Sequence, residues 1–308
     1  MTVSDEVVAG HEPVLVDEML GLLFPGGVGV GGTFCDATVG LGGHAKAILD
    51  HAGPSGRLIG IDRDQDALAF ARGVLEPYAP RVTLVHAPFS RVRSVLEALG
   101  AIPLDGFLVD LGVSSPQLDR AERGFSFQRS GPLDMRMDQS AGETAADLLD
   151  RISQSELERI LRDYGEERFA GRIARHIVEE RVRGTLDSTG ALAAIVARAV
   201  PGRERHKNPA TRTFQALRIA VNRELDELDT FLDQAAECLR PGGRLCVIAF
   251  HSLEDRIVKR RFRALADPAT QGPRLRILTK RIVVASDQEQ ARNPRSRSAK
   301  LRAAEKLE

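Results

Sequence analysis

The sequence is poor in the residues that mark several classes of protein. Its three cysteines form no CxxC pair and its seven histidines no HxxxH pair, so the spacing of a zinc ribbon or a disulfide framework is missing. The longest apolar run, 191–197, is far shorter than the roughly 20 residues of a membrane-spanning helix. The first residues include acids and lack the apolar core of a secretory signal. These absences predict a cytoplasmic protein with reduced thiols and no metal site.

What is present is typical of a globular enzyme. The chain has 308 residues, of which 43% are hydrophobic and 28% charged. At roughly 150 residues per domain, this length predicts two domains, or one domain enlarged by an insertion. No tryptophan and only two tyrosines are available to stack on nucleic-acid bases.

The net charge of zero hides a strong asymmetry. Residues 256–308 contain 15 lysines and arginines against 5 acids, and the rest of the chain contains 28 against 38. Such a segment is either a basic face for a polyanion or a solvated tail. Further cations that could hold phosphates precede a predicted long helix: Arg203, Arg205, Lys207 and Arg212.

The first third of the chain alternates between short apolar runs and helical patterns. Near-continuous apolar strands separated by helices predict a parallel sheet buried on both faces. The predicted strands are 33–36, 57–62, 82–85 and 106–110, and the predicted helices are 44–52, 65–75 and 91–99.

A helical block then interrupts this pattern, as an insertion would. Helices are expected from 144 to 200, including a capping box at Ser153 and Glu156. One long helix is expected from 208 to the glycine turn at 241–243, followed by strands at 244–250 and around 275–284. The stretch 293–300 is polar and basic and is expected to be flexible without its partner. The predicted domains are the first part of an α/β domain, 1–123, an inserted helical domain, 124–212, and the second part of the α/β domain with the basic segment, 213–308.

A glycine turn follows the first predicted strand. The strand ends in Asp36, the turn carries Gly42, Gly43 and His44, and Asp62 closes the second strand. Glycines let the backbone approach a ligand closely, and a strand-end acid can accept hydrogen bonds from ribose hydroxyls. The pattern fits the dinucleotide fingerprint GxGxxG only loosely. Asp36 suits a cationic ammonium or sulfonium group better than a pyrophosphate, which favours S-adenosyl-L-methionine over NAD, although Asp36 could instead cap the following helix.

The fourth predicted strand ends in Asp110 and leads into Ser114-Ser115-Pro116-Gln117. This sequence resembles a degenerate form of the polar-Pro-Pro-aromatic motif of class I methyltransferases that modify exocyclic amines. The cytosine N4 lone pair is delocalised into the ring, so acceptors for its N–H protons would assist the transfer. The alternative is that Ser114, Ser115 and Pro116 form an ordinary loop turn with no catalytic role.

Several longer stretches resemble the MraW (RsmH) family of bacterial 16S ribosomal RNA cytosine-N4 methyltransferases. The resemblance runs from His11 almost to the C-terminus. Its most specific stretches are DLGVSSPQLD (110–119), GFSF (124–127), GPLDMRMD (131–138), NPATRTFQALRIAVN (208–222), FHSLED (250–255) and NPRSRS (293–298).

The resemblance implies an α/β fold, a class I (Rossmann-like) S-adenosylmethionine-dependent sheet with an inserted all-helical domain. It implies methylation of a cytidine N4 in the decoding region of 16S ribosomal RNA within the small ribosomal subunit. The implied donor-binding residues are Gly42, Gly43, His44, Asp62, Phe89, Asp110 and Gln117. Phe89 would lie along the adenine, although a phenylalanine after a strand could equally belong to the core. Ser114 and His251 are candidate catalytic residues, and a satisfied loop histidine is an equal alternative for His251.

Three rival functions remain at the level of sequence. The first is an NAD-dependent oxidoreductase, but the sequence lacks a convincing GxGxxG fingerprint, and such an enzyme would have no need of the basic segment. A non-catalytic ribosome assembly factor would have no need of a donor pocket. An amine methyltransferase acting on another nucleic acid is the nearest enzymatic alternative.

Overall fold

The computed structural model describes residues 12–27, 31–201, 208–269 and 274–308. The chain divides into two compact units, which we call the sheet unit (Met1–Gly112 and Leu225–Glu308) and the helical unit (Val113–Glu224). The cations Arg203, Arg205 and Lys207, which the sequence suggested as phosphate ligands, lie outside the described residues.

The helical unit is wider than the predicted insertion of 124–212. On its N-terminal side, a Cβ added at Gly131 would lie 1.9 Å from the carbonyl oxygen of Ala121, so the backbone on both sides of residue 124 is packed together. On its C-terminal side, a single helix runs past residue 212, and its Phe214 and Leu217 are buried in the same core as the other helices of this unit. The two boundaries therefore fall where packing changes, at residues 113 and 224.

The sheet unit contains one seven-stranded sheet with the order β3-β2-β1-β4-β5-β7-β6. All neighbouring strands are parallel except that β7 runs antiparallel to β5 and β6. This arrangement confirms the predicted α/β class. Strand order reverses between β1 and β4, and ligands of such sheets bind outside the carboxyl ends of the strands at that point. The strands are β1 Thr33–Asp36, β2 Arg57–Asp62, β3 Val82–His86, β4 Leu104–Asp110, β5 Leu239–Ala249, β6 Leu275–Ile277 and β7 Lys300–Lys306.

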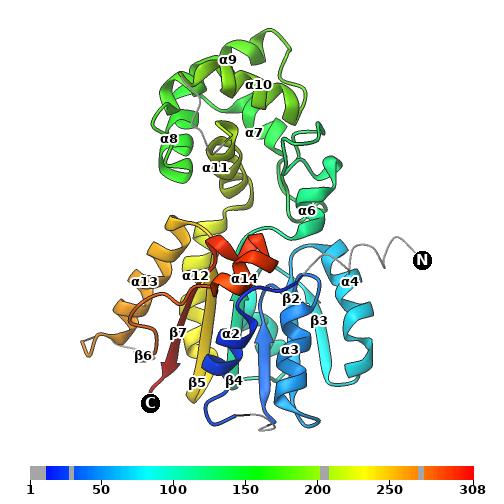
Figure 1. Cartoon of the computed structure of the whole chain (residues 1–308), viewed down its shortest axis with the longest axis vertical. Coiled ribbons are helices and arrows are strands. Elements are labelled where there is room, and N and C mark those ends of the chain that lie inside the picture. Colours follow the sequence, from blue (N-terminus) through cyan, green and yellow to red (C-terminus); the bar gives the residue numbers. More distant parts are fainter. Residues whose placement is uncertain (1–11, 28–30, 202–207, 270–273) are drawn as a thin grey trace. The chain divides into compact units, whose positions relative to one another are not determined.

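Helices cover both faces of the sheet, as Figure 1 shows for the sheet unit. On one face, α2, α3 and α4 bury residues such as Met19, Ile48 and Leu68 against the strands. On the other face, α5, α12 and α13 bury residues such as Leu96 and Phe231. The helices of this unit are α2 Val16–Leu23, α3 Gly43–Ala52, α4 Gln65–Leu75, α5 Val92–Ala98, α12 Glu224–Cys238, α13 Ser252–Ala266 and α14 Asp287–Arg292, with the short 3₁₀ helices η1 Glu76–Tyr78, η2 Phe89–Arg91 and η4 Pro294–Ser298.

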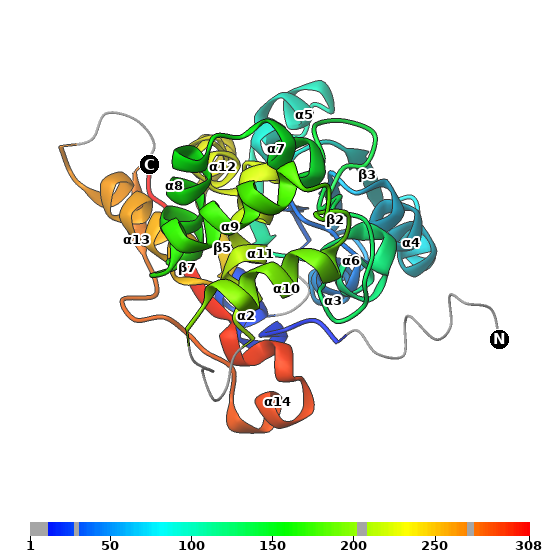
Figure 2. The same ribbon diagram turned by 90° about the horizontal axis from the view of Figure 1, so that it is seen from above.

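The helical unit has a separate apolar core, in which α8 packs against both α9 and α11 (Figure 2). The Ser153–Glu156 capping box is confirmed, because each residue's backbone N–H donates to the other's side chain. The helices of this unit are α6 Ser115–Asp119, α7 Ala145–Arg151, α8 Gln154–Gly165, α9 Ala170–Val182, α10 Thr189–Ala199 and α11 Ala210–Asn222, with the 3₁₀ helix η3 Ala121–Arg123.

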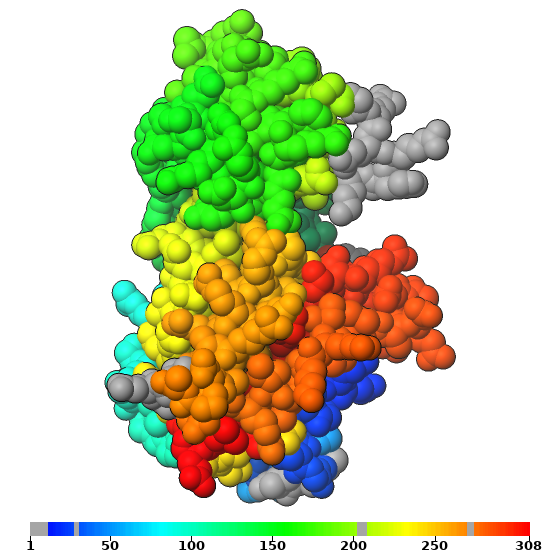
Figure 3. Space-filling model, turned by 90° about the vertical axis from the view of Figure 1, so that its left-hand side faces the viewer, coloured from blue at the N-terminus to red at the C-terminus, as the bar shows by residue number. Residues whose placement is uncertain are grey.

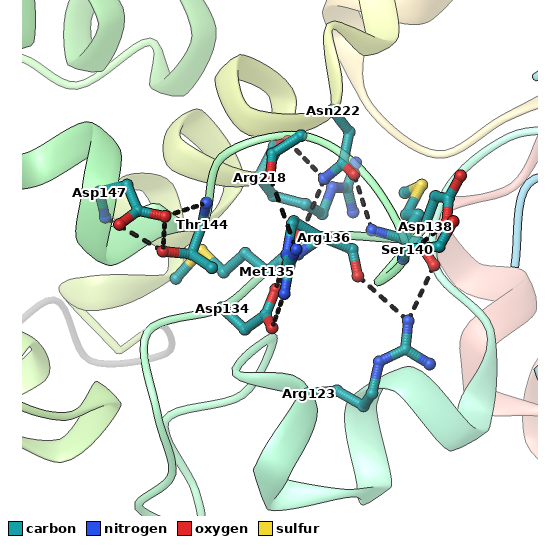
Figure 4. A network of polar contacts seen from close by, with 12 residues as sticks. Arg123, Asp134, Met135, Arg136, Asp138, Ser140, Thr144, Asp147, Arg218 and Asn222 are labelled. Carbon is teal, nitrogen blue, oxygen red and sulfur yellow. Dashed lines mark hydrogen bonds and ion pairs between the residues drawn. The ribbon is translucent and has the colours of Figure 1, made fainter.

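The GPLDMRMD loop of the helical unit is held by two buried side chains (Figure 4). Asn222 accepts from Met137 N at 2.8 Å and donates to Met135 O at 2.7 Å. Arg123 Nη2 donates to the carbonyl oxygens of Arg136 and Met137 at 3.1 and 3.0 Å. Met135 has the left-handed φ of 60°, a strained conformation that persists only where its surroundings fix it. Two of the stretches that carried the family resemblance, 131–138 and 208–222, thus meet in one polar network with Arg123.

Three predictions about the second half of the chain were wrong. The single long helix after residue 208 is two helices, because Arg223 between α11 and α12 has a left-handed φ of 51°. The predicted strand around 275–284 is shorter, since β6 ends at Ile277 and only an isolated bridge joins Val283 to Leu301. The stretch 293–300 is ordered as η4, and the unpredicted strand β7 follows it.

Among the described residues, no helix combines the length and apolar character needed to cross a membrane.

Replacing Asn222 should destabilise the helical unit. We expect Asn222→Ala to lower the free energy of unfolding by about 1–3 kcal/mol, because it leaves the buried Met137 N–H and Met135 C=O without their partner. Urea denaturation followed by circular dichroism would measure the change. The exposed Gln154→Ala, at the start of α8, is the control. Equal stability of the two variants would contradict the role given to Asn222.

Candidate functional site

Three acids and a histidine lie at the carboxyl edge of the sheet, on both sides of the reversal in strand order. Asp36 ends β1, Asp62 ends β2 and Asp110 ends β4. His44 lies in the first turn of α3, which follows β1. Since parallel strands end at the same edge, the topology brings together residues that are up to 74 positions apart in the sequence.

The glycine turn between β1 and α3 is shaped by its hydrogen bonds and its backbone conformation. Gly42 occupies the N-cap position of α3 with a φ of 87°, which an L side chain rarely adopts. The backbone N–H of Gly40 donates to Asp62 Oδ2 at 2.8 Å. Asp62 Oδ1 accepts from Asp64 N at 2.9 Å. Asp62 therefore fixes the turn, and its carboxylate retains lone pairs for a ligand.

His44 connects this turn to Asp110. Its Nε2 donates to the carbonyl oxygen of Val14 at 2.8 Å, because a carbonyl can only accept. In the neutral ring, Nδ1 is then the unprotonated nitrogen, and it lies 3.5 Å from Asp110 Oδ2. Burial lowers the pKa of His44, against the opposing charge of Asp36, which favours this neutral ring.

The three carboxyl groups are held where ionisation is unfavourable. Burial raises the pKa of Asp36 to about 7, although the nearby His44 opposes the shift. Burial, opposed by the N–H groups of Asp64 and Gly40, raises the pKa of Asp62 to about 6. Burial and the neighbouring Glu254 carboxylate raise the pKa of Asp110 to about 8.

Two oxygens of this cluster are left for a ligand. Asp36 Oδ2 and Asp110 Oδ1 are buried without a hydrogen-bond partner among the described residues. Buried polar atoms normally have partners, so each exception calls for an explanation. A cationic ligand would supply the missing interactions and would also favour the charged form of both groups.

Phe89 begins η2, after β3, and its half-buried ring meets Phe231 edge to face, with ring centroids 5.5 Å apart. The ring also packs against the apolar core of the sheet unit. One side of the Phe89 ring thus belongs to the core, as the alternative predicted, and contact of the ring with an adenine remains a prediction.

Ser114 and Gln117 belong to the helical unit. Ser114 is the N-cap of α6, and its backbone N–H donates to Gln117 Oε1 at 2.9 Å. Gln117 is buried. Ser114 therefore starts a short helix, which the sequence did not predict, and the proposed ligand contacts of the two side chains remain predictions.

His251 is the N-cap of α13 and is bound to Glu254. Its Nδ1 accepts from Glu254 N at 3.4 Å, and its Nε2 lies 3.0 Å from Glu254 Oε1. Glu254 Oε2 accepts from the backbone N–H groups of Phe250 and His251. Both ring nitrogens thus lie near Glu254, but the buried Nε2 has no hydrogen-bond partner among the described residues, so the catalytic role of His251 and the satisfied loop histidine both remain predictions.

A surface hollow of about 320 Å³ lies elsewhere in the sheet unit and shares only Gly43 with the predicted donor residues. Its lining contains none of the three strand-end acids, so it is separate from the carboxyl cluster. Its lining residues are Pro13, Leu41, Gly43, Lys46, Ala47, Asp50, Phe70 and Val74.

Comparison with known proteins gives the family. The model of the MraW methylase family matches residues 8–307. The chain belongs to this family. Curated relatives named Ribosomal RNA small subunit methyltransferase H include that of Nitratidesulfovibrio vulgaris strain DP4, with 52% identity over 97% of this chain and 96% of the relative. Another, from Thermomicrobium roseum, is 49% identical over 100% of this chain and 97% of the relative.

Solved structures similar to this MraW methylase are distant in sequence. An rRNA methylase from Streptococcus thermophilus has a TM-score of 0.40 and 10% identity, covering 95% of this chain and 94% of its own. Aeropyrum pernix fibrillarin, crystallised with bound S-adenosyl-L-methionine, has a TM-score of 0.40 and 14% identity, covering 94% of this chain and 72% of its own.

The structure of this MraW methylase adds two residues that sequence reasoning did not single out. Glu254 holds the turn after β5 and raises the pKa of Asp110. Val14 orients His44 through its carbonyl oxygen, which no side-chain pattern can reveal. Both lie in stretches of the family resemblance, FHSLED and the segment that begins at His11, and this was the available signal.

The buried acids should make the ligand-free protein less stable as pH rises. Asp36 has a higher pKa in the folded protein than in the unfolded chain, so the folded state binds more protons between about pH 4 and 7. We expect the stability of the wild type relative to Asp36→Asn to fall over this range, by at most about 1.4 kcal/mol per pH unit.

Urea denaturation of the ligand-free protein at several pH values would test this. Asp66→Asn, at an exposed position in the first turn of α4, is the charge-matched control. A pH-independent difference between wild type and Asp36→Asn would show that Asp36 ionises normally in the folded protein.

Proposed function

We propose that this MraW methylase transfers a methyl group from S-adenosyl-L-methionine to the exocyclic N4 of a cytidine in the decoding region of 16S ribosomal RNA. The observation that carries the proposal is the pair of buried, unpartnered carboxyl oxygens at the reversal of strand order, in a chain of a methylase family. The names of its curated relatives support a small-subunit ribosomal RNA as substrate. The choice of N4 rests on the resemblance carried by residues 110–119.

S-adenosyl-L-methionine is the methyl donor, and it supplies a methyl group activated by a sulfonium centre. The residues at the carboxyl edge fit such a cation. Asp36 Oδ2 and Asp110 Oδ1 would face its positive charges, the sulfonium and the ammonium, and would ionise in its presence. A ligand with neither a positive charge nor a hydrogen-bond donor at this place would leave these oxygens unsatisfied.

The remaining donor-binding residues act on the nucleoside part. Asp62 accepts hydrogen bonds from ribose hydroxyls with the lone pairs that the glycine turn leaves available. The turn at Gly42 and Gly43 allows the backbone to approach the ligand, with His44 beside it. Phe89 offers an apolar ring whose orientation is fixed by Phe231.

On the acceptor side, the protein's main task is positioning. The cytosine N4 attacks the donor methyl, a nitrogen–carbon bond forms as the carbon–sulfur bond breaks, and N4 then releases a proton. In-line placement of the two groups provides most of the acceleration. Ser114 is a candidate for accepting from the N4 protons, whereas Gln117 is one of the predicted donor-binding residues. His251 is the second candidate, since its Nδ1 accepts from Glu254 N at the start of α13 and its buried Nε2 has no hydrogen-bond partner among the described residues.

The RNA must present the target base unpaired or turned out of its helix, since a paired cytosine does not offer N4. We assign recognition of the surrounding RNA to the helical unit and to exposed cations of residues 256–308. This distribution follows the chain's charge asymmetry and the separate core of the helical unit.

Methyl transfer to small ribosomal subunits that lack the modification tests the proposal. We expect label from S-adenosyl-L-methionine to appear in the RNA as N4-methylcytidine, identified by nucleoside mass analysis. Asp62→Ala should weaken donor binding by about 10- to 100-fold, the loss of one or two charge-assisted hydrogen bonds. Asp66→Ala is the control.

Other outcomes would select the rival functions. Label in another nucleic acid, with none in the subunits, would point to a different amine acceptor. Tight binding to subunits without any transfer would point to an assembly factor. Reduction of a substrate by NADH would point to an oxidoreductase.

Donor affinity should rise with pH. The free carboxyl groups of Asp62, Asp36 and Asp110 have pKa values of about 6, 7 and 8, and a bound cation lowers all three. The complex therefore binds fewer protons than the free protein, so affinity increases between about pH 6 and 8 and protons are released.

Calorimetry in buffers of different ionisation enthalpy would count these protons. S-adenosylhomocysteine, which lacks the sulfonium charge, should release fewer. Donor affinity that is constant or falls over this range would contradict the assignment of the cation to these carboxyl groups.

A further inference from the structure

The NPRSRS stretch forms an ordered surface turn, and none of its residues is among the predicted donor-binding residues. Asn293 Oδ1 accepts from Arg295 N at 3.3 Å, and Ser296 Oγ donates to Asn293 O at 2.8 Å. Asn293 and Ser296 are buried, whereas Arg295 and Arg297 are exposed. The asparagine and the first serine therefore fold the η4 turn, and the turn displays both arginines to solvent.

The η4 turn lies at the same edge of the sheet as the carboxyl cluster. It immediately precedes β7, whose first residue, Lys300, pairs with Ala249 at the carboxyl end of β5. Because β7 is antiparallel to the strands that end in the three acids, its beginning is at their ends. In Figure 3 the orange-to-red segment around α14 stands out from the surface of the sheet unit.

A short N-terminal segment connects the turn to the donor residues. Asn293 Nδ2 donates to the carbonyl oxygen of Glu12 at 2.8 Å, and Glu289 Oε1, from α14, accepts from Leu15 N at 2.8 Å. The carbonyl of Val14, between these two residues, holds His44. Asn293 of the turn, Glu289 of α14 and His44 of the donor site thus each hold a backbone group of the segment 12–15.

The charges that the element exposes suit phosphate groups. The acid of α14 that faces the segment, Glu289, is engaged by Leu15, and Glu12 pairs with Arg292 at 2.7 Å. Arg295 and Arg297 are two residues apart on a fixed turn. A guanidinium presents a planar fork of donors that matches phosphate oxygens in two-point contacts.

We infer that Arg295 and Arg297 form an RNA phosphate-binding surface, which holds backbone phosphates of the substrate near the donor site. The inference rests on the proposed function for the identity of the polyanion. It deepens that function by naming the surface that anchors the RNA at the sheet unit. Phosphate contacts of this kind set the position of the RNA and carry no sequence preference.

Salt-dependent binding to small ribosomal subunits that lack the modification tests the inference. The double variant Arg295→Ala/Arg297→Ala should bind subunits about 10-fold or more weakly, and the slope of log affinity against log salt should fall by roughly 0.7–0.9 per lost contact. Donor affinity, measured without RNA, should not change. The control Arg57→Ala/Arg72→Ala removes two exposed arginines from β2 and α4.

A salt slope and affinity equal to those of the control would overturn the inference, and so would a loss of donor affinity in the Arg295/Arg297 variant. Failure of the proposed function gives a different pattern. If the wild type binds subunits through these arginines but transfers no methyl group, the inferred phosphate-binding surface is supported and the proposed reaction is contradicted.

If both double variants methylate and bind like the wild type, the proposed reaction is supported and the inferred surface is contradicted. If the Arg295/Arg297 variant binds an unrelated phosphopeptide more weakly than the wild type does, and binds subunits equally well, the arginines would be assigned to a protein partner.

Discussion

The burial of carboxyl groups at one edge of the sheet is the constraint on which the rest of the site depends. Asp36 is almost fully buried, with 1% of its surface exposed, and one of its oxygens has no partner among the described residues. Transfer of a charged group from water into such a place is costly unless it is paired. Burial therefore makes ionisation of the cluster unfavourable, and a bound cation makes it favourable. Ligand binding and protein stability are coupled through the same few atoms.

That constraint explains why both ends of the chain meet at this edge. His44 must present its unprotonated nitrogen to Asp110, and the carbonyl of Val14 imposes this orientation. Leu15, next to it, has a left-handed φ of 54°, a strained conformation for a branched residue. Glu289 holds the Leu15 N–H from α14, 274 positions away in the sequence. The C-terminal segment thus stabilises a conformation that the N-terminal segment would not adopt alone.

The sequence predicts those parts of the fold whose signal is local. The strands that end in Asp36, Asp62 and Asp110 are continuous apolar runs, and the structure has them at these bounds or within a few residues of them. The acids that close them were identified for the same reason, since a polar residue at the end of a buried strand has a fixed place at the edge. That these acids bind a donor remains a prediction.

The elements that the sequence did not predict depend on contacts between residues that are far apart in the sequence. β7, KLRAAEK, consists mostly of residues with weak strand preference, and it forms a strand because it fills the space between β5 and β6 and buries Leu301 through Ala304. The break at Arg223 is equally invisible, because the helical pattern continues across it. The order of η4 follows from Asn293 reaching Glu12, a contact that no local pattern encodes.

The polar residues of a family motif have two different uses, and the structure separates them. Asn222 and Asn293 both stand in stretches that suggested function, yet their side-chain polar atoms bond to backbone groups of the same unit. They shape loops and turns. Ligand chemistry is instead expected where a motif leaves polar atoms buried without a partner, as at Asp36 and Asp110, or displays charge on a fixed turn, as η4 does. A motif residue is therefore best assigned a ligand-binding or catalytic role only after its internal hydrogen bonds have been accounted for, and Asp36, Asp110 and His251 each keep a buried polar atom without a hydrogen-bond partner among the described residues.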